Sequence, residues 1–199
     1  MSVKHYLRKK FWKLKEFNKN RGLSEYLIPL IGDKKTVTIL EVGSGPVLTI
    51  GNKLREVDVQ ITACDKLANE YAQIYPEVSF KIEYQDMEKL TYPNKSFDIV
   101  HCVNALDHTH HPDKALKELI RVAKEFVYLR HNENEGEEQK YSGLHRWNIE
   151  MAGKDVRFWN PKREFLLSDF GEWKTEKRKE NFKSTHDHGE QIISIHEIH

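Results

Sequence analysis

Five apolar, β-branched runs recur up to residue 131, and helical segments separate most of them. The runs cover residues 36–42, 59–65, 79–86, 96–106 and 125–131. From the spacing of apolar residues, helices are predicted between them at residues 46–57, 66–75 and 111–124. Alternation of this kind is typical of a parallel sheet with right-handed crossovers and helices on both faces. The chain is therefore predicted to be an α/β protein with a doubly wound, mostly parallel sheet.

The two ends of the chain depart from this alternation. Residues 1–17 are basic and carry apolar side chains at helical spacing, and a second short helix is expected at residues 24–31. After the fifth strand, an acidic loop at residues 132–143 leads to a hairpin around residues 152–155. Three elements are expected after the hairpin: a short helix that begins at Pro161, and strands at residues 173–181 and 190–199.

Charge and cysteine usage exclude several kinds of protein. With 32 Lys+Arg against 31 Asp+Glu, the chain lacks the positive excess that nucleic-acid binding requires, so no DNA partner is expected. Cys64 and Cys102 lie in predicted strands and are expected to be buried free thiols, which fits a cytoplasmic location. No apolar run reaches the length of about 18 residues that a membrane span needs. The basic N-terminus also lacks the apolar core of a signal peptide.

The stretch ILEVGSGP, residues 39–46, places a Gly-Ser-Gly turn where the first strand ends. In open α/β sheets, ligands bind beyond the carboxyl ends of the strands. A dinucleotide fingerprint would need a glycine in place of Leu48, and no Lys or Arg lies between Glu41 and Asn52 to bind a phosphate. Pro46 also removes a backbone donor that an anion would use. The turn therefore favours a ligand without phosphates.

Acidic residues follow the next two predicted strands. Asp65 ends the second strand, where a carboxylate can accept hydrogen bonds from both hydroxyls of a ribose. Asp86 ends the third strand, where it can accept from an adenine amino group while Met87 packs on the ring. Each acid has a structural alternative, Asp65 as a helix N-cap and Asp86 as the start of a loop. Together with the turn, they indicate a nucleoside without phosphate, a description that S-adenosylmethionine fits.

These motifs resemble those of the class I S-adenosylmethionine-dependent methyltransferases, especially small single-domain members that act on metabolites. The resemblance rests on ILEVGSGP, ITACD, EYQDME and FDIVHCVNALDHTHHPDKALKELIRVAK, in that order. It implies a Rossmann-like sheet with a C-terminal antiparallel hairpin and S-adenosylmethionine as the cofactor. Val47 is a departure, because many members carry a further glycine there. The residues predicted to bind the cofactor are Glu41, Gly43, Ser44, Gly45, Asp65, Lys66, Asp86, Met87 and Asn104.

The methyl acceptor is expected to bind beyond the fourth and fifth strands. Asp107 and His108 follow the fourth strand, and His108 is a candidate general base because an imidazole titrates near neutral pH. The alternative is a polar loop that ends in a helix cap. No metal is expected, because Asp107, His108, His110 and His111 are not accompanied by a second Cys/His pair at zinc-site spacing.

A second group of candidates follows the fifth strand. Residues 1–35 are expected to be a helical segment that caps the site, residues 36–199 the cofactor-binding domain, and residues 132–160 an insertion that contacts the substrate. The candidates for the substrate side, with Asp107, are Arg130, Tyr141, His145, Arg146 and Trp147. His145 is the second candidate base, the arginines suit an anionic group, and Trp147 suits stacking on the acceptor or, alternatively, the core.

The predicted function is methyl transfer to an oxygen or nitrogen of a small metabolite, sugar-like or anionic, with the oligomeric state left open. Enzymes of this fold that methylate DNA amino groups carry a Pro-Pro-aromatic turn after the fourth strand, whereas residues 104–107 read Asn-Ala-Leu-Asp. Two alternatives stay open: a non-catalytic S-adenosylmethionine-binding regulatory or partner subunit, and a His-rich metal-binding module. The ordered set of Glu41, Asp65 and Asp86 disfavours the metal-binding module.

Overall fold

The computed structural model describes residues 23–46, 48, 50, 51, 53–74, 76, 80–179 and 190–199. Its centre is an eight-stranded sheet in the order β10-β11-β6-β5-β1-β3-β2, with β4 also paired to β3. The predicted helix at residues 1–17 and the Val47 position lie outside the described residues.

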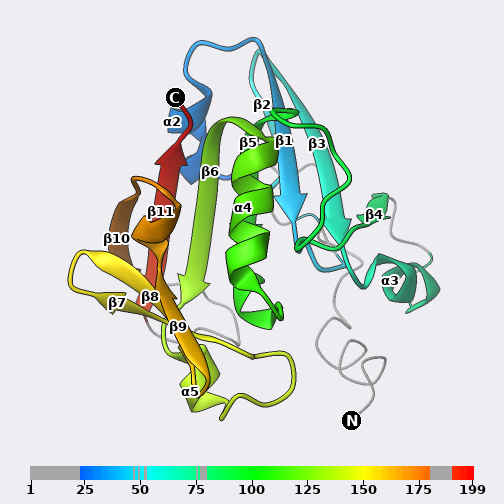
Figure 1. Cartoon of the computed structure of the whole chain (residues 1–199). Coiled ribbons are helices and arrows are strands. Elements are labelled where there is room, and N and C mark those ends of the chain that lie inside the picture. The colour runs from blue at the N-terminus through cyan, green and yellow to red at the C-terminus, as the bar shows by residue number, and fades with distance from the viewer. Residues whose placement is uncertain are drawn as a thin grey trace.

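The parallel part of the sheet consists of the five strands predicted from the sequence. They are β1 (Thr36–Val42), β3 (Val57–Asp65), β4 (Ile82–Tyr84), β5 (Phe97–Val103) and β6 (Ala123–Asn132). β1 pairs in parallel with both β3 and β5, while β4 extends the sheet from β3 and β6 extends it from β5. In Figure 1 the arrowheads of β1, β3 and β6 point to the same end of the molecule. The candidate residues that follow these strands therefore gather at one edge.

Antiparallel strands border this parallel part. β11 (Glu190–Glu197) pairs antiparallel with β6, and β10 (Lys174–Lys179) pairs antiparallel with β11. This arrangement confirms the predicted C-terminal hairpin. On the opposite side, the short β2 (Lys53–Leu54) pairs antiparallel with the start of β3.

Helical segments cover both faces of the sheet. Side chains along each strand alternate between the faces, so a single strand packs against the helices on both sides. One face packs against α4 (Pro112–Val122), whose buried residues join Leu40 and Val42 of β1 in one core cluster. The other face packs Val37 and Ile39 of β1 against η2 (Glu25–Leu27) and α2 (Ile28–Ile31). α3 (Ala68–Ile74) follows β3 and is shorter than predicted. Cys64 and Cys102 are buried and free, as expected.

The predicted helix at residues 46–57 is wrong: its described residues form turns and β2. The backbone carbonyls there have other partners, because Leu23 N–H donates to Lys53 O at 2.8 Å and Ser24 N–H donates to Ile50 O at 2.7 Å. Glu56, at φ 63°, then turns the chain from β2 directly into β3. The described residues after the glycine turn therefore lead into β2 without forming a helix.

A separate three-stranded antiparallel sheet follows the parallel strands. It consists of β7 (Asn148–Ala152), β8 (Asp155–Asn160) and β9 (Arg163–Leu166), and the first two form the predicted hairpin. The helix predicted from Pro161 is wrong over its first half, because Phe165 of β9 stacks on Phe158 of β8 at 4.9 Å. Only η4 (Leu167–Phe170) is helical. The loop expected at residues 132–143 contains a short helix, α5 (Glu135–Glu138).

In the described part of the chain, no helix combines the length and apolar character needed to cross a membrane.

Candidate active site

The glycine turn lies against the end of β3 and hydrogen-bonds to it. Gly43 and Gly45 have φ of 68° and 67°, a region in which glycine carries no Cβ penalty. Gly43 N–H donates to Cys64 O at 2.9 Å. A Cβ on Gly43 would lie 2.5 Å from Ala105 Cβ and 3.1 Å from Met87 Cε, whereas a Cβ on Gly45 would meet no described atom within 4 Å. The turn is thus packed on one side and open on the other, which fits a ligand that approaches Gly45.

Asp65 is held by two backbone donors at the end of β3. Gly45 N–H donates to Asp65 Oδ2 at 3.0 Å, and Leu67 N–H donates to Oδ1 at 2.8 Å. Burial raises the pKa of Asp65 above its ordinary value, although these backbone donors act in the opposite direction. The Tyr71 side chain also hydrogen-bonds to this carboxylate, and since its two oxygens offer four lone pairs in all, capacity for a ribose hydroxyl remains. These residues therefore fit the nucleoside part of the cofactor.

Asp86 and Lys66 form an ion pair beside this turn. Lys66 Nζ lies 2.5 Å from Asp86 Oδ2, and Glu88 N–H donates to Asp86 Oδ1 at 3.1 Å. Burial acts to raise the pKa of Asp86, but Lys66 and the Glu88 amide outweigh it and the pKa lies below its ordinary value. Met87, next in the chain, contacts the Gly43 turn. The adenine contact of Asp86 stays a prediction.

The remaining cofactor candidates lie at the ends of β1 and β5. Glu41 and Ser44 are buried, and Ser44 Oγ donates to Gly45 O at 3.0 Å. Asn104 has φ 48°, and its Oδ1 accepts from Asn132 N–H at 3.0 Å. Asn104 therefore ties the end of β5 to the end of β6, so its side-chain oxygen already has a backbone partner.

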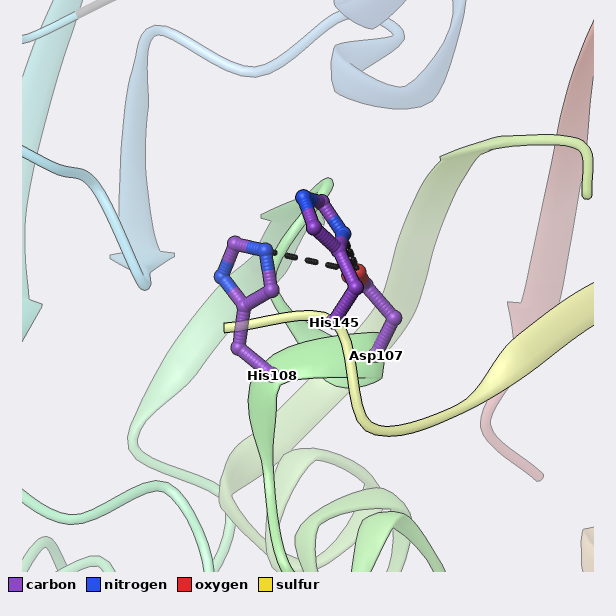
Figure 2. Close-up of side chains that lie close together, drawn as sticks. All are labelled: Asp107, His108 and His145. Carbon is purple, nitrogen blue, oxygen red and sulfur yellow. Dashed lines mark hydrogen bonds and ion pairs between the residues drawn. The ribbon is translucent and has the colours of Figure 1, made fainter. Parts of the chain in front are cut away.

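Asp107, His108 and His145 come together beyond β5 (Figure 2). Asp107 and His108 belong to η3 (Leu106–His108), whereas His145 lies in the segment that leads into β7. Asp107 Oδ2 lies 2.7 Å from His145 Nδ1 and 3.3 Å from His108 Nε2, and the two imidazoles pack edge to face at 4.8 Å. The sequence prediction placed the first two side by side, and the structure adds His145 from 38 residues away.

Backbone contacts fix His145 beside η3. Arg146 N–H donates to Asp107 O at 2.8 Å, and Arg146 Nε donates to His108 O at 3.2 Å. The Arg146 side chain is exposed at this edge. The segment around His145 is thus anchored to the loop that carries Asp107 and His108.

The Asp107 carboxylate is buried among imidazoles. Burial acts to raise its pKa, but the charge of His108 and the bond to His145 outweigh it, so the pKa of Asp107 lies below its ordinary value. His131, at the end of β6, is buried nearby, and burial lowers its pKa to about 4. Neither ring nitrogen of His131 has a hydrogen-bond partner among the described residues. The site therefore stabilises negative charge on Asp107 and keeps His131 neutral.

Three of the predicted substrate residues pack against aromatic rings outside this cluster. Trp147 is 1% exposed and packs edge to face on Phe165 in the core, which contradicts the predicted stacking on an acceptor. Tyr141 packs edge to face on Trp159, with ring centroids 5.9 Å apart. The guanidinium of Arg130 lies over the ring of Tyr26, at 5.5 Å from its centroid.

Sequence reasoning missed Glu135 and Gly136. Glu135 Oε1 lies 3.8 Å from His145 Nε2, so carboxylates flank both nitrogens of this imidazole. A Cβ on Gly136 would lie 2.2 Å from Trp147 O, so only glycine allows α5 to pack against the start of β7. The acidic run at residues 135–138 carries no spacing signal that would single out one glutamate.

Known proteins match this chain in sequence and in fold. Residues 40–129 match a family model described as a methyltransferase domain. A protein of Aspergillus luteorubrus named "Probable methyltransferase ltbC" is 36% identical over 115 residues, which cover 50% of this chain and 40% of that protein. The chain thus spans less than half the length of this curated relative.

Two solved structures extend the likeness to the whole fold. A SAM-dependent methyltransferase of Aquifex aeolicus covers 100% of both chains at 17% identity and a TM-score of 0.52. A SAM-dependent methyltransferase of Thermotoga maritima covers 98% of this chain and 99% of its own at 15% identity, also with a TM-score of 0.52. At such identities these likenesses concern the fold alone. Residues 40–129 thus match a methyltransferase domain, and the chain as a whole shares the fold of these two SAM-dependent methyltransferases.

Proposed function

We propose that this chain transfers the methyl group of S-adenosylmethionine to an oxygen or nitrogen of a small molecule bound beside Asp107 and His108. The observation that carries the proposal is the contact between Gly43 and Ala105, because it joins the cofactor turn to the loop that leads into η3. The charge of His108 also acts to lower the pKa of Asp65, which supports the proximity of the two regions. A methyl donor and a proton acceptor would thus share one edge of the sheet.

The bound cofactor supplies an electrophilic methyl group, and the chain has to position the acceptor and take its proton. With its proton on Nε2, which faces Asp107 Oδ2 at 3.3 Å, His108 can accept a further proton at Nδ1. The buried Asp107 carboxylate would stabilise the resulting imidazolium. We assign the base role to His108. His145, the second candidate, is flanked by two carboxylates and better suited to orient Asp107.

The surrounding segments are proposed to form the acceptor side. The β7–β9 sheet extends the expected insertion at 132–160 as far as Leu166, and its first strand follows directly after His145 and Arg146. The exposed Arg146 is a candidate ligand for an anionic group of the acceptor. The proposal that residues 1–35 cap the site rests on the sequence, because the structure describes only the part of this segment from Leu23 onward.

The test begins with isothermal titration of S-adenosylmethionine, S-adenosylhomocysteine and NAD. Binding of the first two without NAD, followed by cofactor-dependent methylation of a member of a library of alcohols, carboxylates and amines, is expected. Absence of binding in a folded sample would overturn the proposal. Cofactor binding without turnover on any acceptor would favour the non-catalytic subunit instead.

A matched pair of histidine variants tests the base. His108→Ala is expected to lower kcat about 100-fold or more while leaving the affinity for S-adenosylhomocysteine unchanged. His110→Ala is the control, because His110 is exposed and its hydrogen bonds with Glu88 and Arg163 use backbone atoms. Equal losses of kcat and of cofactor affinity in His108→Ala would assign His108 a structural role.

A further inference from the structure

We propose that Asp107, His108 and His145 bind one divalent transition-metal ion, with zinc the best fit to their chemistry. One ligand atom from each residue lies within 4.8 Å of the other two (Figure 2). Two imidazoles and one carboxylate are a set that zinc and related ions prefer, whereas magnesium and calcium prefer oxygen ligands. The sequence argument against a metal concerned Asp107, His108, His110 and His111, and it did not include His145.

The distances from Asp107 to the two imidazoles are near those between ligands of one ion, and the ligand atoms of all three residues lie within 4.8 Å of one another. Zinc–nitrogen and zinc–oxygen bonds of about 2.0–2.2 Å in a tetrahedron place neighbouring ligand atoms about 3.3–3.5 Å apart. Asp107 Oδ2 and His108 Nε2 are 3.3 Å apart. Asp107 Oδ2 and His145 Nδ1 are closer, at 2.7 Å, which is a hydrogen-bond distance. An ion bound to both atoms would lengthen this distance by about 0.6–0.8 Å.

The groups around His145 supply an independent observation. A metal-bound imidazole normally donates its other N–H to a carboxylate or carbonyl, which fixes the tautomer and the ring orientation. With Nδ1 on the ion, His145 carries its proton on Nε2, which faces Glu135 Oε1 at 3.8 Å. Glu135 is itself held, since Asn132 Nδ2 donates to its Oε2 at 3.2 Å. Asp107 and Glu135 together bring two negative charges, which a divalent ion would neutralise.

The backbone around these side chains is fixed before any ion binds. Arg146 N–H holds the His145 segment to Asp107 O at 2.8 Å. Gly136 packs so closely on Trp147 that a Cβ would lie 2.2 Å from its carbonyl oxygen, which sets α5 and Glu135 against the same segment. Three protein ligands leave one position of a tetrahedral ion for water or another oxygen ligand, as in catalytic zinc sites. In the ion-bound protein His108 would be a ligand through Nε2, so the base role proposed above applies to the ion-free protein.

The test uses cobalt as the probe, in the whole 199-residue chain without cofactor or acceptor. After removal of metals with a chelator, titration with Co²⁺ is expected to give the visible absorption of a four-coordinate ion and to saturate at one ion per chain. Binding is also expected to weaken as the pH falls, because protons compete for the imidazole nitrogens. This measurement does not depend on methyl transfer, so its outcome is separate from that of the proposed function.

Three variants of the cluster locate the ion. His145→Ala and His108→Ala are expected to weaken Co²⁺ binding more than 100-fold, and Glu135→Gln about 10-fold because it removes an outer partner only. Far-ultraviolet circular dichroism and thermal unfolding of each variant show whether it is folded. His145→Ala is the primary variant, because His145 lies in a loop.

A second chelating group in the sequence provides the control. His186 and His188 lie outside the described residues, and the double variant His186→Ala/His188→Ala is expected to bind Co²⁺ like the parent. The proposal is overturned if the parent protein gives no Co²⁺ absorption. It is also overturned if folded His145→Ala binds as tightly as the parent, or if the double variant alone abolishes binding.

Discussion

Asp65 and Asp107 both follow parallel strands at one edge of the sheet, yet the protein surrounds them differently. Asp65 accepts hydrogen bonds from the backbone N–H groups of Gly45 and Leu67, and burial raises its pKa. Asp107 faces the imidazoles of His108 and His145, and its pKa lies below the ordinary value even though burial acts to raise it.

The difference separates two kinds of carboxylate. The backbone donors to Asp65 are neutral dipoles, so the carboxylate suits the neutral hydroxyls of a nucleoside. The imidazoles beside Asp107 can bind protons, so this carboxylate suits cations and proton transfer. Under the proposed function, one edge of the sheet would combine a recognition site with a reactive site.

The largest loss of stability is expected where the glycine turn beside Asp65 contacts the loop that leads to Asp107. In Gly43→Ala, the new Cβ would overlap Ala105 at 2.5 Å on a backbone of φ 68°. We expect a loss of about 3–5 kcal/mol in the free energy of unfolding, measured by urea denaturation. Gly45→Ala is the matched control: it has the same backbone strain and no described atom within 4 Å, so about 1–2 kcal/mol is expected. Equal losses in both variants would show that the contact with Ala105 does not constrain the turn.

Exchange of each carboxylate for an amide directly tests the different roles of Asp65 and Asp107. Asp65→Asn is expected to weaken S-adenosylhomocysteine binding about 10- to 100-fold, because charge-assisted bonds of roughly 1.5–3 kcal/mol are lost. Asp107→Asn is expected to change this affinity less than about 3-fold, since Asp107 contacts imidazoles instead. Isothermal titration of both variants measures the difference. A larger loss in Asp107→Asn would reverse the assignment of the two acids.

The pH dependence of stability tests the electrostatics on the Asp107 side. Burial lowers the pKa of His131 to about 4, whereas the unfolded chain binds a proton at the ordinary value near 6.5. The contribution of neutral His131 to the free energy of unfolding is therefore fully present above pH 6.5. It decreases as the pH falls towards 4, and about 2 kcal/mol of it is lost at pH 5. In His131→Leu, the difference in unfolding free energy between pH 7.5 and pH 5 is expected to shrink by about that amount.

The exposed His110 is the control for this measurement, and His110→Ala is expected to keep the parental difference. An unchanged pH dependence in His131→Leu would mean that His131 takes up a proton in the folded state as readily as in the unfolded chain.

The smallest effect on stability is expected from removal of the Arg146 side chain. Because its backbone N–H rather than its side chain anchors the segment to Asp107, Arg146→Ala should lower stability by less than about 0.5 kcal/mol and leave Co²⁺ binding unchanged. Thermal unfolding and the cobalt titration check both points. A drop of more than about 1 kcal/mol would show that the contact of Nε with His108 O positions the cluster.

The sequence predicted the Asp65 side better than the Asp107 side for a physical reason. The contact of Asp65 with Gly45 joins the ends of two neighbouring parallel strands, its contact with Leu67 is local, and strand order follows from the alternation of elements. The meeting of Asp107 with His145 and Glu135 depends on how the β7–β9 sheet and α5 pack, which no local periodicity encodes. The absence of Gly136 from the predicted site has the same origin, because its role lies in a contact with Trp147.

Errors in the predicted elements also arose from tertiary contacts. Residues 46–57 have the composition of a helix, but Ser24 and Leu23 hydrogen-bond to the carbonyls of Ile50 and Lys53. Residues 163–166 were expected to be helical, yet stacking of Phe165 on Phe158 favours a third strand. In both cases a partner distant in sequence outweighs a weak local preference.

The position of β11 between β6 and β10 also affects how the chain folds during synthesis. β6 ends at Asn132, but the strand that covers its outer edge begins at Glu190. At a synthesis rate of about 5–20 residues per second, that edge has no partner from β11 for roughly 3–12 s. Throughout this interval the nascent chain presents an open strand edge to which other chains can pair. Chaperones that bind nascent chains would therefore have most to protect in the period before residues 190–197 leave the ribosome.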